Sequence, residues 1–229
     1  PEAGIAALKT EIRHLVVEVI LYHLRILKLT RREPFLSFQK KEMPVQTKEL
    51  SLTDQYQMIK QLEAEIYTFA SGLQMHELHD NEARELNKLL HATRNAVASA
   101  KILKDIQHNL QEAENSDSAT MEELMQYFKD KWDTTQKEFI AILEHTEVST
   151  NISLLHNLTI KNKDDDIAFT QLITTSIASK KIKQTDIPTL ITINRAFNIS
   201  VRQMIHARRD LVFTEPEAEI VEKLSEAST

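Results

Sequence analysis

Glycine is almost absent from this chain, and that absence most limits how the chain can fold. Only two of the 229 residues are glycine and five are proline. Because these two residues mark most tight turns and interrupt helices, the backbone has few places at which to reverse. The chain is instead rich in leucine, isoleucine, alanine, glutamate, lysine and glutamine, most of which favour helices. We therefore expect an all-α protein with long helices.

Apolar residues at helical spacing, together with capping residues, predict six long antiparallel helices. Their expected positions are residues 2–31, 51–73, 80–114, 119–145, 148–179 and 186–213. A polar connection that contains Pro44 is expected over residues 33–50. The acidic segment after residue 214 is expected to be a flexible tail.

A weak internal repeat divides the six helices into two sets of three. Arg94, Ser99 and Lys101 recur, at the same spacing, as Arg195, Ser200 and Arg202, with an offset of 101 residues. Together with the matching helix count, this indicates a duplicated three-helix unit. The predicted organisation is a first repeat over residues 1–115, a second over 116–214 and a tail over 215–229.

Composition excludes several classes of protein. The net charge of −6 gives no support for a basic surface that binds nucleic acid. The chain has no cysteine, so thiol chemistry and disulfide scaffolds are excluded. Its most apolar run, residues 15–27, is interrupted by Glu18 and Arg25 and is too short for a bilayer helix.

No catalytic motif is visible, and we expect the protein not to be an enzyme. With only Gly4 and Gly72, neither a phosphate-binding loop nor a nucleophile elbow can form. His76 and His79 lie three residues apart in an expected turn, which is not the zinc-protease spacing. The acidic run 164–166 lacks the alternation and glycine of a calcium loop and is interpreted as a solvated stretch.

Several short segments resemble one family. The segment 100–110, AKILKDIQHNL, resembles the PhoU-like cytoplasmic C-terminal region of bacterial sodium/phosphate (Na/Pi) cotransporter proteins. Segments 6–12, 59–66 and 193–200 resemble the first, second and last helices of that region. The resemblance covers about residues 1–214. It implies two tandem three-helix bundles, attached to a membrane domain that moves sodium and phosphate.

Many PhoU proteins hold iron or zinc clusters through Glu-x-x-x-Asp motifs, and here this chain departs from the family. Lys101 and Asp105 stand at the corresponding place in the first repeat, and Arg202 and His206 in the second. A cationic side chain at a ligand position repels a metal ion. We therefore expect no metal and no cofactor at these positions.

Lys101, Asp105, Arg202 and His206 remain the candidate site residues. The simplest interpretation of Lys101 and Asp105 is an exposed ion pair one helical turn apart. The alternative is that Lys101 and Arg202, at equivalent places in the two repeats, bind an anion or contact carboxylates on a partner. Ala92, Ala96 and Ala100 on the same helix are interpreted as close-packing positions.

The resemblance implies a non-catalytic regulatory domain on the cytoplasmic face of the inner membrane. Its expected partner is a membrane transport domain upstream in the same polypeptide, and the apolar stripe of the first helix offers a further contact with a second copy. Two alternatives stay open: a free-standing PhoU-type regulator that binds metal, and a general helical scaffold unrelated to phosphate.

Overall fold

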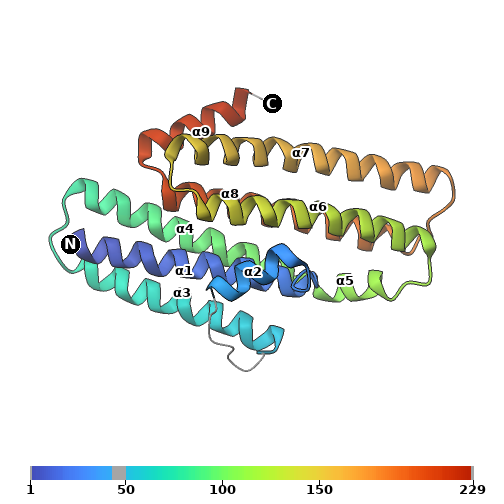
Figure 1. Ribbon diagram of the computed structural model, residues 1–229, viewed down its shortest axis with the longest axis horizontal. Helices are drawn as coiled ribbons and strands as arrows, with labels where there is room; N and C mark the ends of the chain where they lie inside the picture. The colour runs from blue at the N-terminus through green and yellow to red at the C-terminus, as the bar shows by residue number, and fades with distance from the viewer. Residues whose placement is uncertain (1, 43–49, 228–229) are drawn as a thin grey trace.

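The computed structural model describes residues 2–42 and 50–227, and every regular element in it is a helix (Figure 1). Over those residues there are nine helices and no strand, which confirms the predicted all-α class. The helices are α1 (Glu2–Ile26), α2 (Glu33–Glu42), α3 (Leu52–Gln74), α4 (Asp80–Asp105), α5 (Gln107–Glu114), α6 (Ala119–Glu144), α7 (Val148–Ala178), α8 (Ile187–Val212) and α9 (Glu215–Ala227). Six are long; the shorter α2 and α9 were not among the six predicted helices, and α5 falls within the helix predicted over residues 80–114.

The long helices run back and forth along one axis, and the helices of each half of the chain lie together (Figure 1). In the first half α1 packs on α3 and α4, and α3 also contacts α4. In the second half α7 packs on α6 and on α8. The halves join where α4 lies antiparallel to α8, in the most extensive helix contact among the described residues. The α4/α8 seam is therefore the centre of the molecule.

Small residues on α4 lie among the helices that approach it closely, α1 and α8 among them. Ala92, Ala96 and Ala100 are fully buried, as their predicted packing role requires. The backbones of α1 and α4 lie close along their length, because methyl side chains take up little space between neighbouring helices. As a result α1 is enclosed over residues 15–24, all of which are buried, including Glu18 and His23.

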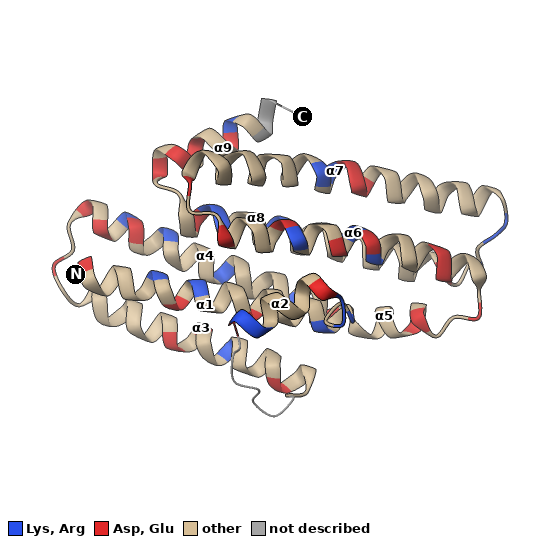
Figure 2. Cartoon of the chain, in the orientation of Figure 1, with Lys and Arg blue, Asp and Glu red and all other residues tan. Residues whose placement is uncertain are grey.

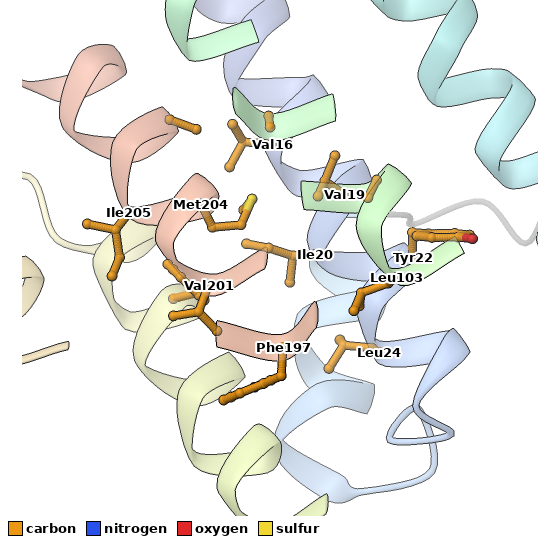
Figure 3. Close-up of a cluster of buried hydrophobic side chains, with 14 of the residues drawn as sticks. Val16, Val19, Ile20, Tyr22, Leu24, Leu103, Phe197, Val201, Met204 and Ile205 are labelled. Carbon is orange, nitrogen blue, oxygen red and sulfur yellow. The ribbon is translucent and has the colours of Figure 1, made fainter. Parts of the chain in front are cut away.

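Aromatic side chains fill the corresponding space in the second half. The rings of Trp132 and Phe128 on α6 have centroids 4.2 and 5.3 Å from the ring of Phe197 on α8. Phe169 of α7 joins the cluster with its ring 5.6 Å from that of Phe128. Figure 3 shows Phe197 among the buried apolar side chains of α1, α4 and α8. The large rings bridge α6 and α8 across a wider spacing than the alanines of α4 allow.

Two helices end on a lysine in place of the usual glycine. Lys28 has φ 57° and Lys180 has φ 53°, in the left-handed region that glycine normally occupies. At the first site the N–H of Leu29 donates to the carbonyl of Leu24 at 2.7 Å, and the N–H of Lys28 to that of Arg25 at 3.0 Å. This pair of bonds closes a Schellman motif. It ends α1 at Ile26, five residues before the end predicted from periodicity.

The predicted third helix is divided in two. At Ile106 the backbone leaves helical geometry, with φ −98° and ψ 9°, while its side chain stays buried. After this break α5 packs on α6 and α8 through buried Leu110 and Ala113. The single helix expected over residues 80–114 is therefore corrected to α4 and α5. The turn between α5 and α6 follows directly.

The connection expected between the first two long helices contains α2. Phe35 and Phe38 of α2 are buried, and the helix contacts α1 and α6. Two aromatic residues at i,i+3 give even a polar segment one apolar face, which stabilises a short helix by packing. Pro44, also placed in that connection, lies outside the described residues.

The predicted flexible tail over residues 215–229 is corrected as well. Its described part is the helix α9, which packs on α7 and α8. The N–H of Thr214 donates to the Glu217 carboxylate at 2.8 Å and caps the start of α9. Val221 is only 3% exposed, so it anchors the helix to the bundle. An acidic composition concealed this apolar anchor.

Candidate functional site between α7, α8 and α9

The structure separates the four predicted site residues into two different environments. Lys101 and Asp105 lie on the exposed side of α4, where the Lys101 ammonium is 2.6 Å from an Asp105 carboxylate oxygen. Their side chains are 62% and 51% exposed. The hydrogen bond to Asp105 raises the pKa of Lys101 above its ordinary value. This is a solvated ion pair within one helix, and its cation is already neutralised.

Arg202 and His206 instead line a cavity of about 460 Å³ between α7, α8 and α9. We call this space the Arg202 cavity. Helix α7 contributes Thr159, Asn162, Lys163 and Asp166; α8 contributes Asn198, Arg202, Ile205, His206 and Arg209; and α9 contributes Val221 and Glu222. Residues 202, 206 and 209 recur at i, i+4 and i+7, so they share one face of α8. Residues 159, 162, 163 and 166 face them from α7 at similar helical spacing.

Three cationic side chains line the cavity, and they differ in how far they are neutralised. The Arg209 guanidinium lies 2.9 Å from an Asp210 carboxylate oxygen and 3.8 Å from one of Glu222. Arg202 and Lys163 form no hydrogen bond or ion pair with any residue that the structure describes, and both side chains are exposed. The cavity therefore contains cationic charge that has no partner of its own. Figure 2 shows the charged residues of α7 gathered in its middle, with uncharged turns on both sides.

The inner wall of the cavity is a buried amide network. One Asp166 oxygen accepts hydrogen bonds from the amides of Asn194 at 2.6 Å and Asn198 at 2.9 Å. The Asn162 amide donates to the backbone carbonyl of residue 198 at 3.2 Å. The side-chain oxygens of Asn162 and Asn198 are buried and have no partner among the described residues. Such acceptors are costly to leave unsatisfied.

His206 is neutral near pH 7. Its pKa lies below the ordinary value, chiefly because burial penalises the charged imidazolium and next because Arg209 is close; Asp210 opposes this shift, and Arg202 adds to it. A neutral imidazole offers one donor and one acceptor.

A second polar cluster lies at the α4/α8 seam, and it is enclosed. Ser99 and Ser200 each donate a hydroxyl to the other's backbone carbonyl, at 2.9 and 3.1 Å. The Nε2 atom of His23 lies 3.2 Å from the Ser99 hydroxyl, and its Nδ1 atom lies 3.5 Å from the Gln136 amide nitrogen. Both serines are fully buried and no carboxylate joins them. This cluster holds the helices together and is closed to a substrate.

Sequence reasoning identified Arg202 and His206 but missed the residues around them. The run 164–166 was interpreted as a solvated stretch, and Asp164 and Asp166 are exposed, with Asp166 lining the cavity. Asp165 corrects that interpretation, because it is buried and paired with Lys131 at 2.6 Å. Arg209 and Lys163 could have been found from the shared helical spacing described above. Of the two histidines of the expected turn, His79 precedes α4, and its backbone N–H donates to the Glu82 carboxylate at 2.9 Å.

Comparison with family models, curated proteins and solved structures gives no match to this chain. Within residues 2–42 and 50–227, no helix combines the length and apolar character needed to span a bilayer. In the same part of the chain, no three histidine or carboxylate side chains are grouped closely enough to hold a metal ion.

Proposed function

We propose that this chain is a non-catalytic regulatory domain of the PhoU-like type, built from two three-helix repeats that meet at α4 and α8. The observation that carries the proposal is the reciprocal pair of hydrogen bonds between Ser99 and Ser200. These residues occupy equivalent places in the two repeats, 101 positions apart. Equivalent residues that exchange equivalent bonds are expected on a pseudo-twofold axis between two duplicated units.

The proposed repeats are residues 1–115 and 116–214. In the first, α1, α3 and α4 are mutually in contact; in the second, α7 contacts both α6 and α8. The turn after α5 separates the two sets, and α9 follows the second. This order supports the duplication inferred from the sequence, because each repeat then contributes its last long helix to the seam.

The proposed mechanism is docking on a transport domain that moves sodium and phosphate across the inner membrane, from its cytoplasmic face. The attribution to transport rests on the sequence resemblance of residues 100–110 to the Na/Pi cotransporter family. A domain that contacts one state of its partner better than another shifts the equilibrium between those states. With a net charge of −6, this chain is suited to a basic partner surface.

A first test is to read the coding sequence upstream of Pro1. The proposal expects several apolar segments of about 20 residues each, the length needed to span a bilayer. An upstream sequence without apolar segments would contradict the link to a transport domain.

A second test measures sodium-driven phosphate uptake in cells that express the complete polypeptide, and compares it with a version that lacks residues 1–229. The regulatory proposal expects both versions to reach the membrane and to differ in uptake rate or in its dependence on phosphate. Binding between the purified domain and the purified transport domain should weaken as salt is added, because exposed charges are screened. Equal uptake together with absent binding would rule the docking mechanism out.

A further inference from the structure

We infer that the Arg202 cavity binds a small organic phosphate, meaning a phosphate group attached to a compact body that carries hydroxyl or amino donors. The inference concerns ligand binding by this chain itself. It does not depend on the docking function proposed above.

The phosphate group is assigned to the open side of the cavity, beside Arg202 and Lys163. Both side chains reach the cavity from facing helices, and neither has an acidic partner among the described residues. A guanidinium presents paired donors that match two phosphate oxygens, and an ammonium adds a compact charge. The equivalent position in the first repeat differs in its pairing, since Lys101 already has Asp105 as an ion-pair partner.

The size of the cavity calls for more than a bare phosphate ion. At about 460 Å³ the cavity is larger than a single phosphate ion, which would leave part of it unfilled. Ligand pockets of about 300–1,000 Å³ typically bind complete small molecules. Ile205 and Val221 supply an apolar surface in the same cavity, against which the body of an organic molecule can pack.

The polar wall of the cavity requires donors on that body. The carboxylates of Asp166 and Glu222 line the cavity and act as acceptors, whereas the buried oxygens of Asn162 and Asn198 are enclosed within the wall and do not meet a ligand. A phosphate offers almost no donors near neutral pH, whereas ribose hydroxyls or an amino group do. The acceptors therefore favour a sugar phosphate or nucleotide over an inorganic anion.

The inference can be tested by isothermal titration calorimetry on the purified chain at fixed ionic strength. The four probes are adenosine monophosphate, ribose 5-phosphate, inorganic phosphate and adenosine. Both organic phosphates should bind. Inorganic phosphate and adenosine should each bind the chain at least about tenfold more weakly than adenosine monophosphate, because each lacks half of the recognised chemistry.

A matched pair of variants locates the binding. Arg202→Gln removes the unpaired guanidinium from the cavity, and Arg195→Gln removes the same charge from an exposed position of α8 that does not line it. Arg202→Gln should weaken binding of adenosine monophosphate by about tenfold or more, and Arg195→Gln by less than about twofold. Both replaced side chains are exposed, so thermal unfolding followed by circular dichroism should be nearly unchanged in both.

His206 gives a second readout that does not depend on binding heat. The charged groups around it are Arg202, Arg209 and Asp210 on α8, Lys163 and Asp166 on α7, and Glu222 on α9. An anion bound among them favours the imidazolium, so adenosine monophosphate should raise the pKa of His206, measured by NMR titration of its ring protons. Arg202→Gln should reduce this rise.

Three results would overturn the inference. The first is no saturable binding of either organic phosphate at millimolar concentration. The second is inorganic phosphate or adenosine binding as tightly as adenosine monophosphate. The third is equal weakening by Arg195→Gln and Arg202→Gln, which would indicate long-range charge in place of a built site. None of these results bears on docking to a transport domain, so the two proposals fail separately.

Discussion

Helices α4 and α8 are alike on the face through which they contact each other, and they differ on their other faces. This contrast accounts for much of how the two halves pack. At the seam Ser99 and Ser200 make the same bonds to each other. Close to these serines in the sequence, Ala96 and Ala100 of α4 correspond to Phe197 and Val201 of α8 at the same offset of 101 residues. Small side chains bring α1 close to α4, whereas large ones hold α6 farther from α8.

The two helices also differ in how they end. After α4 the chain bends at Ile106 and continues as α5, which stays along the bundle. After α8 it reverses at Thr214, and α9 packs back on α7 and α8. The reversal closes one side of the Arg202 cavity, and the exposed pair of Lys101 and Asp105 has no such cover. The residues that repeat between the halves therefore form the α4/α8 seam, whereas the segments that follow each repeat determine which positions are covered.

The largest expected effect comes from removing the aromatic bridge of the second half. Trp132 is fully buried, with its ring 4.2 Å from Phe197 and 5.9 Å from Phe128. Trp132→Ala should lower the free energy of unfolding by about 3–5 kcal/mol, because the void cannot be closed by neighbouring helices. Urea denaturation followed by circular dichroism measures the change.

A matched control for this substitution is Phe69→Ala, which truncates an aromatic residue that is 45% exposed on α3. Its effect should be much smaller, since little packing is lost. Trp132→Phe should also be milder than Trp132→Ala, because the Trp132 Nε1 atom is buried with no hydrogen-bond partner among the described residues. Equal losses for Trp132→Ala and Phe69→Ala would show that the rings do not support α8.

The second prediction tests the close approach in the first half. Ala96 is fully buried, and α1 packs closely on this helix. Ala96→Leu should lower the free energy of unfolding by about 1–3 kcal/mol, because the added carbons force α1 and α4 apart. The same denaturation measurement applies.

Ala64→Leu on the exposed face of α3 is the matched control, and it should change stability by less than about 0.5 kcal/mol. A neutral or stabilising Ala96→Leu would mean that α1 and α4 leave spare volume. The contrast between small side chains packed in the first half and aromatic side chains packed in the second would then be lost.

Much of the helical content could be predicted from local sequence signals. Ser51 caps α3 as expected, with its hydroxyl accepting from the N–H of Asp54 at 3.0 Å. Two features could not be predicted in this way. The left-handed Lys28 ends α1 where no glycine marks an end, whereas the end of α7 at Ala178 was predicted to within one residue. The break at Ile106 depends on how α5 packs against the other half, which is a tertiary effect that overrides local preference.

The candidate site was predictable only in part, for a related reason. The repeat pointed to Lys101 and Arg202 equally, because it compares positions and contains no information about what covers them. The helix α9 distinguishes them, and its acidic sequence concealed the anchor Val221. The unsatisfied oxygens of Asn162 and Asn198 follow from the packing of α7 on α8 and could not be read from either segment alone.

The last prediction concerns how stability changes with pH at His23, and it tests the comparison between the two halves most directly. It touches only one member of the symmetric serine pair, with Nε2 3.2 Å from the Ser99 hydroxyl, and its ring packs edge-on against Trp132. Burial lowers the pKa of His23 to about 3 from an ordinary value of 6.5. In the folded state His23 is therefore neutral, whereas in the unfolded chain it gains a proton below pH 6.5.

Because the unfolded state binds the extra proton, acid favours unfolding. The His23 contribution to stability is complete above pH 6.5, and it falls by about 1.4 kcal/mol per pH unit below that value until the folded-state pKa near 3. Between pH 7 and pH 5 the loss should be about 2 kcal/mol. His23→Gln cannot take up this proton, so its stability should fall less over the same range, whatever its stability at pH 7.

Urea denaturation at pH 7 and pH 5 measures the two slopes, and His108→Gln on the exposed side of α5 serves as the control. The control should keep the wild-type slope. If His23→Gln also keeps the wild-type slope, the buried imidazole takes up its proton in the folded state as well. A neutral His23 would then not be the group that links α1 to Ser99 and Gln136. A shallower slope only in His23→Gln would place the asymmetry between the halves at the seam itself, beside the one feature that they share.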